Sequence, residues 1–113
     1  MTKIVLAAIL ALSATPALAG GAANFTLVNG TGAALADLSI RRSGTQEWKA
    51  LGPAPGAGAR GSISFGDPDC AFDLRAMVPG AGPVTWAGVN LCDVKSVTLQ
   101  HDSSAGAWVD YDQ

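Results

Sequence analysis

The residues His101, Asp102 and Ser103 are of the types that make a hydrolase triad, and His101 is the only histidine in the chain. Triads, however, are assembled in space from distant segments, so three consecutive residues are a poor match. The stretch is polar and ends in Gly106, and Asp and Ser commonly form turns. We therefore interpret these residues as a turn, and we expect a protein that is not an enzyme and has no catalytic residues.

Three carboxylates could instead hold a metal ion. Asp67 and Asp69 precede one cysteine, Cys70, and Asp93 follows the other, Cys92. A bond between the cysteines would bring Asp69 and Asp93 together, and carboxylates with loop carbonyls are ligands for Ca²⁺. The alternative is that Asp-Pro-Asp forms a turn and Asp93 is solvated. We expect no cofactor, with Ca²⁺ at Asp67, Asp69 and Asp93 as the alternative.

The three tryptophans could bind a ligand by stacking. Trp86 alternates with apolar residues and is expected in the core, whereas Trp48 is expected to be the most exposed. Stacking of a sugar on Trp48 or Trp108 is a further alternative.

Asp73 and Arg75 alternate with apolar residues, which predicts that both point outward into solvent.

The N-terminal residues 1–19 have the layout of a secretory signal peptide. Lys3 precedes an apolar run at 4–12, and Ala17-Leu18-Ala19 is a small-residue cleavage site. The run is shorter than the about 20 residues of a membrane span. We expect an exported protein, located in the periplasm if the source is Gram-negative and secreted otherwise.

Residues 20–113 then form the mature chain, which is 113 − 19 = 94 residues long and has a net charge of 6 − 9 = −3. This length fits one domain. The acidic balance and the lack of a basic stripe argue against nucleic acid as a partner, and we expect no stable membrane insertion after the leader is removed.

The two cysteines lie almost symmetrically about a Pro/Gly turn at 79–83. In an oxidising compartment, an even pair in a small domain is most often a disulfide; zinc and a catalytic thiol are the alternatives. A hairpin centred on Ala81 would place Cys70 directly opposite Cys92, within disulfide range. A bulge at Gly88 would shift this register by one residue.

Apolar residues recur with period two along most of the chain, which predicts strands. We expect an all-β fold: a small antiparallel β-sandwich of about seven strands with one cross-strand disulfide, or else a small barrel. A segment at 45–51 is ambiguous between a helical turn and a short edge strand, and the Gly/Ala/Pro-rich loop at 52–61 is predicted to connect two sheets. The expected strands cover 24–29, 34–42, 62–65, 70–78, 84–92, 94–100 and 107–111.

Several motifs resemble a family of small exported bacterial β-domain proteins of unknown function. They are FTLVNGTG from Phe25, a Trp-x-x-Leu-Gly at Trp48, the C-x-x-D-L strand from Cys70, and the W-x-G-V-N-L-C strand from Trp86. The resemblance extends to Leu99. Relatives are sometimes labelled argininosuccinate lyase, but such lyases resemble large helical tetramers, and 94 β-rich residues cannot form one. The resemblance implies a fold and a compartment, and it supplies no catalytic residues.

Together these observations predict an exported, non-enzymatic envelope or secreted interaction module whose partner is a protein. The alternative is a small-ligand or Ca²⁺-binding module.

Overall fold

Eight strands and no helix make up residues 21–112, the part of the chain that the computed structural model describes. The predicted signal peptide, residues 1–19, lies outside this part. The strands are β1 (Phe25–Asn29), β2 (Ala36–Arg42), β3 (Lys49–Ala50), β4 (Arg60–Ile63), β5 (Ala71–Val78), β6 (Gly82–Asn90), β7 (Ser96–Asp102) and β8 (Gly106–Asp112).

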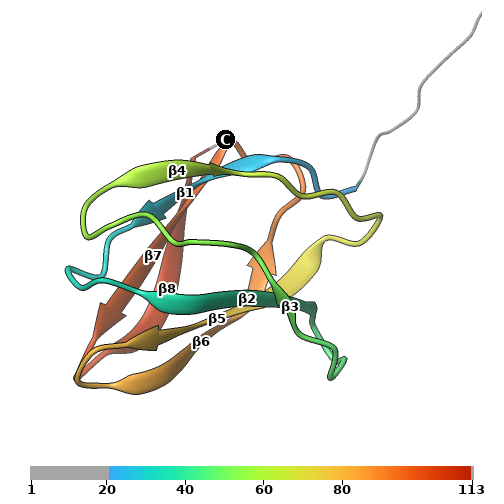
Figure 1. The fold of residues 1–113 in the computed structure, drawn as a ribbon. Coiled ribbons are helices and arrows are strands. Elements are labelled where there is room, and N and C mark those ends of the chain that lie inside the picture. The colour runs from blue at the N-terminus through green and yellow to red at the C-terminus, as the bar shows by residue number, and fades with distance from the viewer. Residues whose placement is uncertain (1–20, 113) are drawn as a thin grey trace, which may run out of the picture.

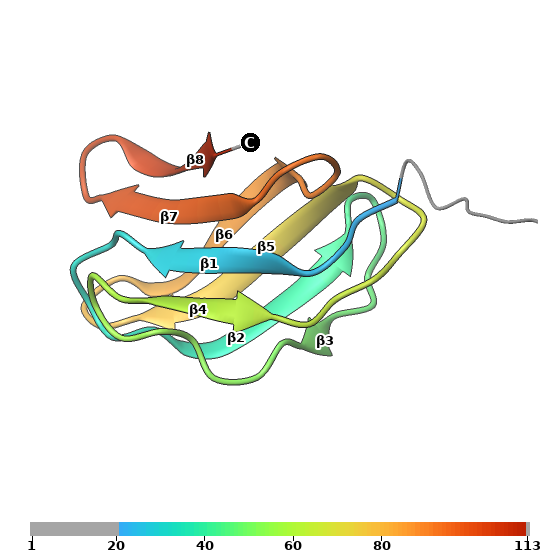
Figure 2. The ribbon, with the colours of Figure 1, turned by 90° about the horizontal axis from the view of Figure 1, so that it is seen from above.

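The strands form two four-stranded sheets that face each other, with orders β4-β1-β7-β8 and β3-β2-β5-β6 (Figures 1 and 2). The all-β sandwich prediction is confirmed, with eight strands in place of about seven. Five of the six pairings that join neighbouring strands are antiparallel, and the exception is the parallel pair of β1 with β7. No helix in the described residues could cross a membrane.

The core lies between the sheets and follows from the alternation in the sequence. Each strand sends alternate side chains inward, so residues two apart share a face. The indole N–H of Trp86, which is 1% exposed, donates to the carbonyl of Gln100 at 2.8 Å, so this large side chain is buried without an unpaired donor. The core side chains on the strands are Phe25, Leu27, Leu38, Ile40, Ile63, Phe72, Leu74, Ala76, Val78, Trp86, Val89, Val97 and Leu99.

The β5–β6 hairpin is centred on Gly80, so the predicted centre at Ala81 is wrong. Val78 pairs with Gly82, because the amide of Ala81 donates to the carbonyl of Val78 at 2.9 Å and closes a tight turn. Pro79 sets φ at the second position of this turn, and Gly80 has φ of 83° at the third. These are the residues a type II turn prefers. Shifting the centre by one residue moves each pairing by two, which keeps the side chains between the turn and the bulge of β6 on their predicted faces.

The bulge considered at Gly88 is present. Leu74 pairs with Trp86 and Phe72 with Val89, so two residues of β6 oppose one of β5. Gly88 has φ of 65°, a left-handed conformation that suits glycine. The extra residue exchanges the faces of β6, which explains why Trp86 and Val89 are both buried.

The disulfide between Cys70 and Cys92 is confirmed, with Cα atoms 5.1 Å apart. Its predicted position as a directly opposed pair is wrong: the amide of Leu91 donates to the carbonyl of Cys70, so Leu91 lies opposite Cys70. Cys92 follows the end of β6 and reaches back to its partner. The bond therefore closes the hairpin just beyond its last paired residues.

The remaining predicted boundaries differ by a few residues. The ambiguous segment at 45–51 contains the edge strand β3, and the Pro/Gly-rich segment that follows crosses from one sheet to the other, as predicted. The strand expected at 62–65 is β4, two residues earlier, because Val28 pairs with Arg60. Phe65 lies beyond the end of β4, and its amide donates to the side-chain Oδ1 of Asn24 at 2.7 Å.

Candidate functional site

A buried carboxylate organises the outer face of the sheet β3-β2-β5-β6. Asp73 on β5 is 5% exposed, and its Oδ2 accepts from the Nε of Arg41 on β2 at 2.8 Å. Its Oδ1 accepts from the hydroxyl of Ser43 at 2.8 Å and from the amide of Gly88 at 3.0 Å. The prediction that Asp73 is solvated is therefore wrong: the bulge of β6 and the neighbouring strand β2 enclose it.

The Asp73 carboxyl remains charged in this position because its partners outweigh burial. Burial alone raises the pKa of Asp73, but hydrogen bonds from Gly88, Ser43 and Arg41, together with the charge of Arg41, lower it, and the net pKa lies below its ordinary value. Asp73 thus satisfies the bulge amide of β6 and fixes the side chain of Arg41.

Two guanidinium groups lie over the ring of Trp48, next to this network. The Cζ of Arg75 is 4.0 Å from the ring centroid and that of Arg41 is 4.5 Å. Trp48 immediately precedes the edge strand β3, and the arginines come from β5 and β2. Trp48 is half-buried and Trp108 is exposed, so the expectation that Trp48 is the most exposed tryptophan is wrong. Arg75 is also half-buried, so the prediction that it is solvated is wrong as well. Cation–π contacts of this kind hold both side chains in place. We call Arg41, Trp48 and Arg75 the Arg–Trp cluster.

A shallow groove of about 250 Å³ lies beside Arg75 on the same face. Met77 and Pro83, which pair across β5 and β6, are on one side of it, and Met77 is 42% exposed. Asp37 lines it as well, at a bulge of β2 where its φ is 54°. The residues lining this groove, which we call the Arg75 groove, are Asp37, Ser39, Arg75, Ala76, Met77 and Pro83.

A second pocket, of about 270 Å³, lies near the C-terminal end of β2. Ile40, Phe65 and Phe72 give it an apolar lining, and the rings of Phe65 and Phe72 meet edge to face with centroids 5.1 Å apart. The charged side chains that line it are Arg41, Arg42, Glu47, Lys49 and Asp67.

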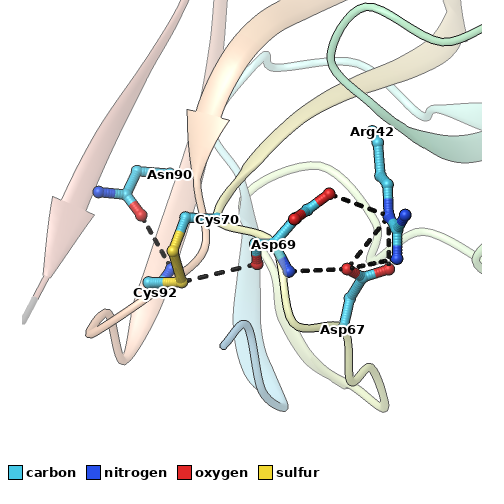
Figure 3. The surroundings of a disulfide bond; sticks show 6 residues. All are labelled: Arg42, Asp67, Asp69, Cys70, Asn90 and Cys92. Atoms are coloured by element: carbon cyan, nitrogen blue, oxygen red, sulfur yellow. Dashed lines mark hydrogen bonds and ion pairs between the residues drawn. A yellow bond between two sulfur atoms is a disulfide. The ribbon is translucent and has the colours of Figure 1, made fainter. Parts of the chain in front are cut away.

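Two of the three predicted acidic residues, Asp67 and Asp69, pair with an arginine (Figure 3). An Arg42 nitrogen is 3.1 Å from Asp67 Oδ1, and its Nε is 3.2 Å from Asp69 Oδ2. The Asp69 amide donates to Asp67 at 2.8 Å, which is the predicted Asp-Pro-Asp turn. Asp93 does not join them, and residues 21–112 contain no group of three or more His, Cys, Asp or Glu side chains placed to hold a metal ion. Calcium binding by Asp67, Asp69 and Asp93 stays an untested prediction.

These contacts also move the pKa values at this end of the molecule. The backbone N–H of Asp69 is the largest influence on the pKa of Asp67 and lowers it; Arg42 adds to this effect, while burial opposes it. The hydrogen bond and charge of Asp67, followed by the charge of Asp69, raise the pKa of Arg42. The sulfur of Cys92 lies 3.6 Å from the carbonyl oxygen of Asp69, so the disulfide packs against this turn.

The segment His101-Asp102-Ser103 closes the β7–β8 hairpin. The Oδ1 of Asp102 accepts from the amides of Ser104 and Ala105 at 2.7 and 3.0 Å, and these two bonds lower its pKa. The turn prediction holds for Ser103, and Asp102 binds the turn with its side chain, but His101 and Asp102 are themselves paired residues of β7, so the prediction that they lie in the turn is wrong. Trp108, on β8, is 43% exposed and lies on the other sheet from Trp48, so the two do not form one stacking surface.

Sequence reasoning missed the Arg–Trp cluster because its members come from two strands and from the segment just before a third. Alternation placed Arg41 and Arg75 on the outward face, but it could not show that Trp48 would fold back over them. The one available signal was Gly88 in mid-strand, since a glycine there often marks a bulge, and a bulge opposite Asp73 leaves an amide for it to bind.

Comparison with known proteins supports the fold alone. No family model matches the chain, and no curated protein matches it. A solved structure described as the NMR structure of the protein from Eubacterium rectale is similar, with a TM-score of 0.55 and 15% sequence identity over 81% of this chain and 89% of that chain. The β-sandwich architecture is therefore shared with a known protein, and the resemblance to the exported bacterial family stays a prediction.

Proposed function

We propose that this chain is an exported, non-enzymatic domain that binds a protein partner, in the periplasm of a Gram-negative source or outside the cell otherwise. The signal peptide predicted at 1–19 and the disulfide between Cys70 and Cys92 support export. Disulfides persist in oxidising compartments and are rare in the cytosol.

The observation that carries the binding role is the Arg–Trp cluster. Arginine and tryptophan are enriched among the residues that contribute most to protein interfaces. The side chains are held in advance: Asp73 fixes Arg41, and Trp48 holds Arg41 and Arg75. A surface that is already ordered loses less side-chain entropy when a partner binds.

Crosslinking of the exported protein in its native host, followed by mass spectrometry, tests this function. The expected result is a specific, saturable protein partner. A comparison variant has both Arg41 and Trp48 replaced by alanine, and its folding is verified by circular dichroism. It should capture less of the partner, because the Arg–Trp cluster is lost. A specific partner captured equally by this variant would locate the binding surface elsewhere. The absence of any specific partner would count against the function itself.

A second candidate function, binding of a small molecule, is supported by the pocket beside Phe65 and Phe72. Its wall of Ile40, Phe65 and Phe72 would contact the apolar part of a ligand, and the five charged side chains of its lining would pair with polar or charged groups. Thermal-shift screening of amphipathic compounds would test it, and the gain in melting temperature should disappear in Phe65→Ala. If compounds raise the melting temperature of wild type and Phe65→Ala equally, they bind elsewhere.

A further inference from the structure

We infer that the Arg75 groove binds an acidic polypeptide segment, with the guanidinium of Arg75 pairing with a carboxylate of the partner. This inference rests on the proposed function and names the surface and the chemistry of the partner.

Arg75 is an arginine of this sheet whose charge is not matched by an ion pair within residues 21–112. Among residues 21–112, the arginines that form ion pairs are Arg41, with Asp73, and Arg42, with Asp67 and Asp69. Arg75 forms none there, and its one charge-related contact is the ring of Trp48 at 4.0 Å. A guanidinium held against a ring keeps its N–H donors at the edge of its plane. That geometry suits a carboxylate, which accepts two parallel hydrogen bonds from one guanidinium.

The other polar groups of the groove favour a polypeptide over an acidic polysaccharide. Asp37 also lines the groove and is exposed, so its carboxylate would repel a chain that carries only negative charge. A polypeptide places N–H donors or a basic side chain close to an acidic one, and so it complements both Arg75 and Asp37. The backbone bulge at Asp37 fixes this second position on the face.

The apolar wall of the groove agrees with this choice. Met77 is 42% exposed and sits beside Pro83, so a partner side chain without charge has a surface to cover. Methionine is flexible and polarisable, and it adapts to the shape of an incoming apolar side chain. The expected partner segment therefore carries an acidic residue next to an apolar one.

Site-specific photo-crosslinking in the native host tests the inference. The photoreactive residue is introduced by Met77→benzoylphenylalanine, and the control is Trp108→benzoylphenylalanine, which lies on the other sheet and is similarly exposed at 43%. Each is combined with Arg75→Ala or with Arg60→Ala, a matched loss of an exposed arginine on β4.

The expected result is one protein crosslinked from position 77. Its yield should fall about tenfold with Arg75→Ala, as for the loss of one charge-assisted hydrogen-bonded pair, and should be unchanged with Arg60→Ala. The crosslinked peptide should contain Asp or Glu near the point of attachment. Replacing that residue by lysine should weaken binding to wild type and restore it to Arg75→Glu.

Other outcomes would overturn the inference in distinguishable ways. A protein captured from position 108 but not 77, or captured from 77 regardless of Arg75, would leave the proposed function standing and refute this site. An adduct that resists protease and is degraded by glycosidases would identify a polysaccharide. Absence of any protein adduct from both positions would count against both proposals. If Arg75→Ala does not fold, Arg75→Lys replaces it, since lysine keeps the charge and loses the paired donors.

Discussion

Replacing Asp73 by asparagine removes one negative charge from the centre of the Arg41 network and keeps the shape of the side chain. The amide oxygen of asparagine can still accept from Ser43 and Gly88, because one oxygen has two lone pairs. The bond from Arg41 Nε at 2.8 Å cannot persist, since the amide NH₂ group is also a donor.

The expected loss of stability is about 2 kcal/mol. Hydrogen bonds to charged groups contribute about 1.5–3 kcal/mol, and breaking a fully buried ion pair costs about 3–5 kcal/mol. The side chain of Asp73 is 7% exposed, but that of Arg41 is 23% exposed, so water can partly solvate the guanidinium that is left alone. The expected loss of stability therefore lies within the lower of the two ranges, the one for a hydrogen bond to a charged group.

Urea unfolding at pH 7, followed by tryptophan fluorescence and circular dichroism, measures this change. The control is Asp93→Asn, an exposed aspartate with φ of 61°. Asparagine tolerates that conformation, and the change should stay within about 0.5 kcal/mol. A free energy of unfolding for Asp73→Asn within the same margin of wild type would refute the importance of the network.

The pH dependence gives an independent check of sign. The pKa of Asp73 is lowered in the folded protein. Its stabilisation is therefore fully present above the unfolded pKa, about 3.9, and is lost as the pH falls through the folded pKa. The stability difference between wild type and Asp73→Asn should be largest near neutral pH and should shrink below about pH 4. A difference that grows on acidification would contradict the lowered pKa.

Three further predictions address other parts of the molecule. Replacing Cys70 and Cys92 by serine should lower the free energy of unfolding by about 3 kcal/mol, because the disulfide that joins residues 22 positions apart no longer restricts the unfolded chain. The melting temperature should fall by about 10–25 °C. An unchanged melting temperature would contradict this prediction. Gly88→Ala should lower the free energy of unfolding measured in urea by about 1–2 kcal/mol, because the φ of Gly88 is 65°. Gly66→Ala should leave that free energy unchanged, because Gly66 has an ordinary φ and an added Cβ would meet open space. Millimolar Ca²⁺ should leave the melting temperature unchanged, because Asp69 already pairs with an arginine; a rise abolished by Asp69→Ala would establish the calcium site.

The period-two pattern predicted the sandwich, and it predicted the inward faces of the strands up to the bulges of β2 and β6, where the faces exchange. It predicted the disulfide as well, although by an incorrect register. The turn at 79–83 offered several possible centres, and the hydrogen bond from Ala81 to Val78 decides between them. Sequence spacing alone cannot make that choice, because Pro79-Gly80 and Gly82-Pro83 are both turn-forming pairs.

The candidate site was less predictable because it depends on neighbours across strands. Alternation correctly gave Asp73 an outward direction. Its burial comes from Arg41 and Ser43 on one side and from the bulge at Gly88 on the other. The sequence contains all of these residues, but which strands pair, and in which register, has to be known before they can be seen to meet.

The parallel pairing of β1 with β7 has a consequence for how the chain acquires its structure. Thr26 pairs with Ser96, so this pairing joins residues 96 − 26 = 70 positions apart. The hairpins β5–β6 and β7–β8 involve only local contacts, whereas the sheet that contains β1 must wait until almost the whole chain is available. Pairings between distant segments slow folding. We therefore expect β1, which can pair with β4 earlier, to gain its β7 partner only when almost the whole chain is available, so that this sheet is completed late in folding.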